Sequence, residues 1–275
     1  MSGLVVSALI GIVFVMITVT IMAGSYFVAR KVLSPGAEGD RTHDVASAVA
    51  TRIAALHGLI LALVYAQELD DYKDVRSTLA QEAVAVADIF NDIQRYGGPP
   101  VAPVRAGLAQ YVQTVVTVEW QELGERRGLA AQAWIAWDRV YNQLLDLSPQ
   151  SDRQTFLANR MRGRATDIAG FRQMRESAVL DRFSELFWAP ALIGLVLLAA
   201  PFYVYRPTRT HLVLFAVFGA YSGMILFFIY AFSNPFARPG RLEALPFVRL
   251  LEGDLGKALP PNGQDFGANS AGSKT

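Results

Sequence analysis

Long apolar runs alternate with charged segments along this chain, and they come as two pairs. Residues 1–29, 186–205 and 210–237 contain no Asp, Glu, Lys or Arg. A fourth run, residues 45–67, is interrupted by one arginine and one histidine. About 20 such residues in a helix cross the hydrocarbon core of a bilayer, and inside lipid a helix satisfies its own backbone hydrogen bonds. The pattern therefore predicts a membrane protein with four transmembrane helices.

The first apolar run could serve either as a transmembrane helix or as a signal peptide. No basic residue stands in front of it, and it is longer than the roughly 7–15 apolar residues of a signal-peptide core. We therefore predict a first transmembrane helix over Leu4–Val28, closed by Arg30 and Lys31. The segment 33–44 contains Pro, Gly and several charges and is expected to be a loop. Residues 45–67 then form the second transmembrane helix.

The charged segment between the two pairs has the pattern of a helical bundle. Residues 67–95 contain neither Gly nor Pro, so the second helix is expected to continue past the bilayer and to end at Gly97. Apolar residues spaced three and four apart fall on one face of a helix, and three such stripes follow one another here. They are Leu79, Ala83, Val86, Phe90 and Ile93, then Val104, Leu108, Tyr111, Val115 and Val118, then Trp134, Trp137, Tyr141 and Leu144. We expect these residues to form a core.

A last soluble helix is predicted ahead of the second pair of apolar runs. Ser151 or Asp152 can act as its N-cap, because a short oxygen-bearing side chain accepts a hydrogen bond from the first helical turn. The helix is expected to run towards the membrane through Phe156, Ile168 and Phe171.

The second pair of apolar runs predicts a helical hairpin. Helix three is expected over residues 186–205 and helix four over residues 211–232, with Pro235 after it. The turn between them, residues 206–210, is short enough to make the two helices antiparallel neighbours. The end of the chain from Pro260 is rich in Gly, Ser and Asn and is expected to be disordered.

The predicted fold is an all-α membrane protein with its four transmembrane helices in a 2 + 2 arrangement and a soluble helical bundle between helices two and three. Residues 1–67 hold the first two transmembrane helices, and residues 68–184 form a soluble helical domain continuous with helix two. Residues 185–236 hold the second pair. Residues 237–275 form a tail, disordered from about residue 260.

Composition narrows the class of protein further. Charged residues make up 18% of the chain and apolar residues 52%, whereas soluble domains carry about 25% charged residues. The net charge of +1 gives no reason to expect a nucleic-acid partner. The absence of cysteine excludes disulfides, thiolate catalysis and thiolate metal sites. No metalloprotease motif, phosphate-binding loop or nucleophile elbow occurs, so we expect no enzyme, no cofactor and no metal site.

Helix two differs from the other predicted spans because it carries Arg52 and His57. Polar side chains inside a membrane usually face the interior of a bundle or a water-filled path. Arg52 could instead extend to the membrane surface, and His57 could form a hydrogen bond with a neighbouring helix. Both alternatives remain open from the sequence.

Two charged clusters lie in the predicted soluble domain. Arg153, Arg160 and Arg164 are spaced to share one helical face, where they would attract anions if they lined the vestibule of an assembly. On the surface of a monomer they would be ordinary solubilising charges. Three acidic residues at i, i+1 and i+4 could bind a cation but more often form a solvated face: Asp70, Asp71 and Asp74.

Several short motifs of the chain resemble those of the bacterial bestrophin-like membrane proteins. They span roughly residues 50–125 and 185–252, and each is weak by itself, but their order agrees with the four-span layout. They are His57 to Leu63 (HGLILAL), Asp71-Tyr72, Arg76, Glu82-Ala83, Asp88, Tyr111, Val115-Val116, Glu119-Trp120, Ser233-Asn234-Pro235-Phe236, Pro246-Phe247 and Leu250-Leu251.

The resemblance implies a pentameric ion channel in the bacterial inner membrane, with the soluble domain in the cytoplasm. In bestrophins the second helices surround the pore, and apolar side chains four residues apart form a neck. The corresponding positions here are Leu59, Leu63 and Gln67, which four-residue steps place on one helical face. Gln67 departs from the apolar pattern. The implied partners are the lipid bilayer, further copies of the chain and small inorganic ions, with anions the expected class.

A second class of function stays open from the sequence. Helix two, continuous from the bilayer into the soluble domain, would suit equally a membrane scaffold or sensor that conducts nothing. In that case the helical domain would bind a partner. The number of copies in the assembled protein separates the two classes.

Overall fold

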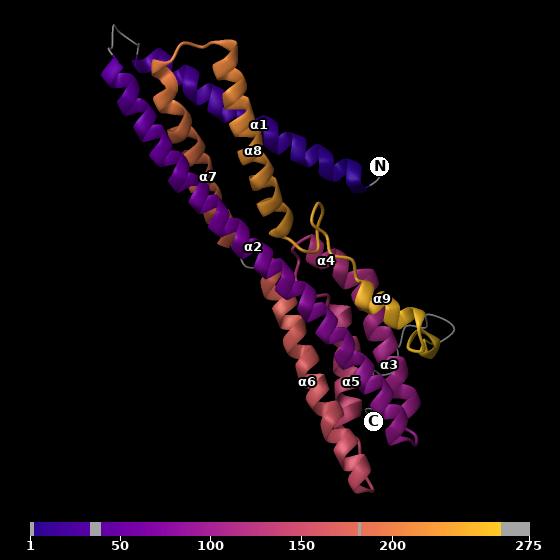
Figure 1. Ribbon diagram of the computed structural model, residues 1–275. Coiled ribbons are helices and arrows are strands. Elements are labelled where there is room, and N and C mark those ends of the chain that lie inside the picture. Colours follow the sequence, from indigo (N-terminus) through magenta and orange to yellow (C-terminus); the bar gives the residue numbers. More distant parts are fainter. Residues whose placement is uncertain (1–2, 34–39, 181–182, 260–275) are drawn as a thin grey trace, which may run out of the picture. The chain divides into compact units, whose positions relative to one another are not determined.

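The computed structural model describes residues 3–33, 40–180 and 183–259, and each regular element in these ranges is a helix (Figure 1). The all-α prediction is confirmed over the described chain. Residues 34–39 of the predicted loop at 33–44 and the predicted disordered end from residue 260 lie outside the described residues. The rest of the predicted loop is helical, because the first helix extends to Leu33 and the second begins at Asp40, so the loop prediction is wrong there.

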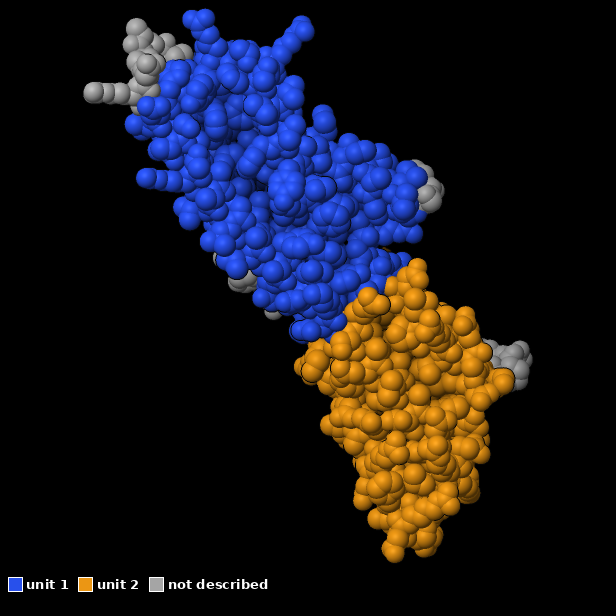
Figure 2. Space-filling model, viewed as in Figure 1, with its two compact units in different colours: residues 1–75, 177–242 blue, residues 76–176, 243–275 orange. Residues whose placement is uncertain are grey.

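The chain divides into two compact units, each of which combines two parts of the sequence (Figure 2). Unit 1 comprises residues 1–75 and 177–242, and unit 2 comprises residues 76–176 and 243–275. Helix α2, Asp40–Tyr96, contributes its first part to unit 1 and its second part to unit 2. It runs without interruption to the residue before Gly97, where the sequence predicted its end.

Unit 1 contains the apolar helices. These are α1 (Gly3–Leu33), the first part of α2, α7 (Phe183–Ala199) and α8 (Arg209–Phe232). All four are long and apolar enough to cross a membrane, as the sequence predicted. The predicted third span ends as a 3₁₀ helix, η2 (Ala200–Val204), because a proline near the start of that turn has no N–H for the α-helical ladder.

Helices α1 and α8 pack closely because two glycines of α8 lie four residues apart. A Cβ atom on Gly219 would lie 3.1 Å from the Cα of Val19, and one on Gly223 would lie 2.8 Å from the Cα of Val15. The Thr18 hydroxyl, buried at this crossing, donates a hydrogen bond of 2.7 Å to the Gly219 carbonyl. Small residues that allow backbones to approach, with a hydroxyl bonded across, are typical of helix pairs in membranes.

The core of unit 1 surrounds α7. Side chains from α1, α2 and α8 pack against it, so the first part of α2 has one face inside the unit. The buried members of this core are Met22, Leu61, Phe187, Ala191, Leu195, Leu198, Ala199, Leu226 and Ile229.

Unit 2 is a bundle of shorter helices around the second part of α2. It contains α3 (Val101–Thr114), a π-helical turn η1 (Val115–Glu119), α4 (Trp120–Gly124), α5 (Ala131–Leu145), most of α6 (Asp152–Leu180), α9 (Leu245–Glu252) and the 3₁₀ turn η3 (Gly256–Ala258). Residue 151 caps α6 as predicted, since its Oγ accepts a hydrogen bond of 3.3 Å from the Gln154 N–H. Helix α9 lies in the segment for which the sequence predicted only a tail.

Most residues of the predicted stripes lie in the core of unit 2, but on α5 Trp134 is 41% exposed and Tyr141 is half-buried. The α2 stripe is buried throughout, but on the following helix Val118 is only half-buried and Glu119 is buried in its place. The π turn adds residues to one helical turn and so rotates position 119 inward. Helix α6 runs through Phe156, Ile168 and Phe171 as predicted; of these, Ile168 is buried, Phe171 is half-buried and Phe156 is 65% exposed.

Candidate functional site

The predicted neck stripe lies on the face of α2 that points away from the core of unit 1. Leu59 is 56% exposed and Leu63 62% exposed, and Gln67 is exposed as well. Gln67 donates a hydrogen bond of 2.8 Å from its amide to Asp71 on the next turn. In a single copy this apolar stripe would face lipid, and it is available for contact with other copies or for lining a path between them.

The two polar residues of α2 lie on different faces. Arg52 is exposed and stands seven residues before Leu59, which places both side chains on the same face of the helix. His57 is only 4% exposed and packs against α7, where a Cβ on Gly194 would lie 2.8 Å from the Cε1 of the imidazole. His57 Nε2 has no hydrogen-bond partner among the described residues. The structure therefore groups Arg52 with the stripe and separates His57 from it.

The arginines of α6 are partly neutralised by α2. Arg160 lies 3.5 Å from Asp88 and 3.3 Å from Asp92, and Arg164 lies 3.0 Å from Asp88. Arg153 is exposed. Because two of the three cations have carboxylate partners on α2, their combined attraction for anions is weaker than the sequence alone indicated.

The acidic cluster on α2 is a solvated face. Asp70 pairs with Lys73 at 3.0 Å, and both side chains are exposed. Among the described residues, no group of three or more His, Asp or Glu side chains is placed to hold a metal ion.

Unit 2 contains a buried network of acidic and basic side chains that the apolar pattern of the sequence did not predict. Glu82 of α2, Glu119 of η1, and Arg172 and Arg175 of α6 have fully buried side chains. The Arg175 guanidinium lies between both carboxylates, with Nε 3.1 Å from Glu82 and Nη2 2.8 Å from Glu119. Arg172 Nη2 lies 2.9 Å from the other oxygen of Glu119. Three elements that are far apart in the sequence are thus joined by ion pairs.

Aromatic groups complete this network. The Tyr111 hydroxyl donates a hydrogen bond of 2.5 Å to Glu82. The Arg172 guanidinium lies 4.5 Å from the centre of the Trp134 ring and 5.2 Å from that of Tyr111, in the geometry of cation–π contacts. Phe247 of α9 is fully buried beside Arg175, at 5.8 Å, and against Trp120. The network therefore also connects α3, α5 and α9.

Burial changes the acid–base properties of two members. It raises the pKa of the Glu82 carboxyl, an effect that the positive charge of Arg175 and the hydrogen bond from Tyr111 oppose. Burial, and then the negative charge of Glu82, raise the pKa of the Tyr111 hydroxyl well above its ordinary value. Taking ions out of water costs free energy that their pairing repays only in good geometry. The net stabilisation by such a network is therefore small, whereas the loss of one partner leaves an uncompensated buried charge.

One sequence signal could have identified the buried arginines. From residue 161 onward, the buried residues of α6 follow a regular spacing of four and three: Met161, Ala165, Ile168, Arg172, Arg175 and Val179. Two arginines thus occupy positions that the period assigns to the core. Arginine is rarely buried unless it is paired, so its presence there indicates acidic partners on the facing helices.

Comparisons with known proteins agree with this architecture. Residues 16–247 match the family model of the bestrophin-like domain. Two crystal structures of mutant forms of a bacterial bestrophin homolog from Klebsiella pneumoniae have the same fold, at 12% sequence identity. One gives a TM-score of 0.61 and covers 89% of this chain and 98% of its own. The other gives 0.60 and covers 90% and 98%. No curated protein matches the chain.

Proposed function

The chain belongs to the bestrophin-like family, and from that premise we propose that it is an ion channel built from several copies of itself. The assembly is a homo-oligomer, a pentamer by analogy with the family, in which α2 of each copy surrounds a central pore. The protein lies in the bacterial inner membrane with its spans in a 2 + 2 arrangement and unit 2 in the cytoplasm.

The exposed stripe of α2 carries this proposal. Leu59 and Leu63 are large apolar residues that the chain itself leaves uncovered, on the helix that also carries an exposed arginine. In a ring of copies the two leucines would form an apolar neck, and Gln67 would make one end of that neck more polar. Narrow apolar constrictions control ion flow by excluding water.

The proposed cargo is small inorganic anions. Arg52, on the same face of α2 as Leu59, would attract anions to the pore entrance. The arginines of α6 are weaker candidates for a charged vestibule, because Asp88 and Asp92 lie against them. His57 is proposed to support the packing of α2 on α7 and not to line the pore.

Shortening the neck residues tests the proposal directly. The double variant Leu59→Ala, Leu63→Ala should have a larger single-channel conductance than the wild type in planar bilayers, because a wider neck holds water more readily. The matched control is Val213→Ala, Val217→Ala, which shortens two exposed residues four positions apart on α8 and should leave the conductance unchanged. Equal single-channel conductances of the wild type and the neck variant would show that this stripe does not line the pore.

A non-conducting scaffold or sensor is the second candidate, and the length of α2 favours it. This helix extends over 57 residues and takes part in both compact units, so it could transmit a signal between them. A purified protein that is monomeric or dimeric and gives no current would support the scaffold. A closed ring that conducts would exclude it.

A further inference from the structure

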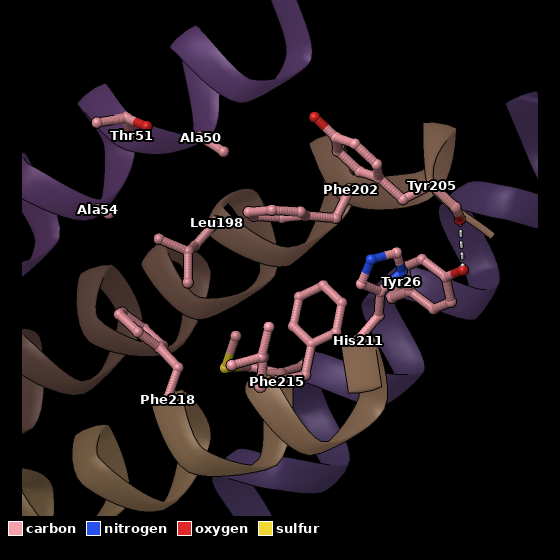
Figure 3. Close-up of a pocket in the computed structure, with 12 residues that line it drawn as sticks. Tyr26, Ala50, Thr51, Ala54, Leu198, Phe202, Tyr205, His211, Phe215 and Phe218 are labelled. Carbon is pink, nitrogen blue, oxygen red and sulfur yellow. Dashed lines mark hydrogen bonds between the residues drawn. The ribbon is translucent and has the colours of Figure 1, made fainter. Parts of the chain in front are cut away.

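A cavity of about 490 Å³ lies within unit 1, between α1, α2, α7, η2 and α8 (Figure 3). Its volume is in the range of small-molecule sites, which is roughly 300–1,000 Å³. The side chains of Ala54, Leu198, Phe215 and Phe218 form much of its wall. All of these elements belong to helices apolar enough to cross a membrane, so the cavity lies at the level of the lipid.

The polar groups of the wall are occupied by the protein itself. The Tyr26 hydroxyl donates a hydrogen bond of 2.8 Å to the Tyr205 carbonyl, which Figure 3 shows as a dashed line. The Tyr205 hydroxyl donates to the His43 carbonyl at 3.3 Å, and the Thr51 hydroxyl donates to its own helix at 2.9 Å. These donors are therefore not available to a polar ligand, and the chemistry of the wall suits a hydrocarbon chain.

Basic side chains stand at one end of the cavity. Tyr205 and His211, which line it, flank the turn that carries Arg206 and Arg209, both of which are exposed. The Nδ1 of His211 is 2.8 Å from the Arg206 carbonyl, so the basic turn is fixed to the cavity wall. Arg30 at the end of α1 is used internally, since it donates to two carbonyls of η2 and the following residue.

We propose that this cavity holds one acyl chain of an anionic phospholipid from the surrounding bilayer, with the phosphate of that lipid at Arg206 and Arg209. The apolar walls of the cavity suit the acyl chain. The exposed guanidinium groups of Arg206 and Arg209 suit the phosphate, which arginine binds with two parallel hydrogen bonds. Aromatic residues at this end of the cavity are typical of the membrane–water interface. Lipid binding at this site does not depend on ion conduction by the protein.

Native mass spectrometry of the purified full-length protein tests the site. The delipidated protein is mixed with vesicles of phosphatidylglycerol or of phosphatidylcholine with the same acyl chains, and the lipids that remain bound after detergent extraction are counted. We expect bound phosphatidylglycerol and little bound phosphatidylcholine. Equal retention of the two lipids, or retention of neither, would overturn the proposal.

Two pairs of variants separate the cavity from general lipid contact. Thr51→Phe extends a ring into the cavity and should abolish retention of phosphatidylglycerol, whereas Thr20→Phe should not. The two threonines are matched, because each is exposed and donates its hydroxyl to its own helix. Undiminished retention by Thr51→Phe would overturn the acyl-chain site.

The second pair tests the phosphate contact without changing the cavity. Arg206→Gln, Arg209→Gln should reduce phosphatidylglycerol retention to the level of phosphatidylcholine. The control Arg238→Gln, Arg241→Gln removes two exposed arginines beyond the other end of α8 and should retain the lipid as the wild type does. Equal losses in both double variants would show that total charge and not this turn holds the lipid, against the proposal.

Discussion

Arg175 is the residue on which most of the buried network depends. Among the ion pairs of the described residues, only the Arg175 guanidinium contacts both Glu82 and Glu119. All three side chains are fully buried. A buried carboxylate that loses its cation has no water to replace it. The two glutamates are therefore tolerated because this arginine lies between them.

Arg175→Met should destabilise the protein strongly. Removing one partner from a buried ion pair costs about 3–5 kcal/mol of unfolding free energy, because the remaining charge is uncompensated. Thermal or denaturant unfolding in detergent measures the loss. Arg164→Met on the same helix is the control: its pair with Asp88 is partly exposed and should contribute only about 0–1 kcal/mol. Equal small losses in both variants would contradict the importance of the network.

Glu82 should make stability depend on pH. Because burial raises its pKa above the ordinary value of 4.5, its contribution to stability is fully present below pH 4.5. That contribution is lost as the pH rises through the folded-state pKa. Glu82→Gln removes this titration, so the unfolding temperature of the variant should rise relative to the wild type as the pH increases above 4.5.

The opposite trend would be equally informative about Glu82. If Glu82→Gln became less stable than the wild type with rising pH, the attraction of Arg175 would outweigh the cost of burial, and the pKa would be lowered. Unfolding curves at several pH values between about 4 and 8 decide between the two signs.

Core positions on α2 were predictable from the α-helical period. Leu79, Val86 and Ile93 are buried as their spacing predicted, since a regular helix repeats every 3.6 residues. Glu119 was not predictable in this way, because the π turn before it breaks the period and leaves no mark in the apolar pattern. Arg172 and Arg175 were not predicted to be buried, because an arginine carries no apolar signal even where the helical period places it in the core.

At the scale of elements, the crossing of α1 and α8 is set by backbone contact. Gly223 has the Val15 Cα and the Phe14 carbonyl close by, at 2.8 and 3.0 Å from the place of a Cβ. Neither atom can move without the helix that carries it. The hydrogen bond from Thr18 to Gly219 depends on the same close approach.

Gly223→Ala should therefore separate α1 from α8. An added methyl group in a packed interface costs about 1–3 kcal/mol when backbone has to move. The unfolding temperature in detergent should fall. Gly24→Ala is the control, because a Cβ at position 24 would meet nothing within 4 Å. The unfolding temperature of this variant should stay unchanged or rise, since alanine favours the helix. A fall of the same size in both variants would point to a general effect of α1 and not to the crossing.

Helix ends were predictable where Gly and Pro mark them, and less so elsewhere. The end of α2 before Gly97 and the start of α6 after residue 151 follow from local chemistry. Helix α9 has only eight residues, and Phe247, its fully buried residue, is held by tertiary contacts with Trp120 and Arg175. Such a short helix depends on packing partners, which local sequence does not reveal.

At the scale of the whole molecule, α2 belongs to both compact units and also carries the proposed neck residues. Its buried face is fixed in unit 1 by α7 and in unit 2 by the ion-pair network, while Leu59 and Leu63 remain uncovered. The class of the fold could be predicted because four apolar runs of membrane-spanning length are unambiguous in sequence. The way in which copies assemble could not be predicted from the residues alone. The apolar stripe formed by Leu59 and Leu63 suits contact with lipid and contact with another copy equally well.

The arrangement of α2 in the assembled protein is the most direct test of this account. We predict that electron-microscopic images of the purified particle in detergent show a closed ring of five copies, with the Leu59–Leu63–Gln67 face of α2 around the axis. A monomer, a dimer, or a ring with this face on the outer, lipid-facing side would contradict the proposed pore.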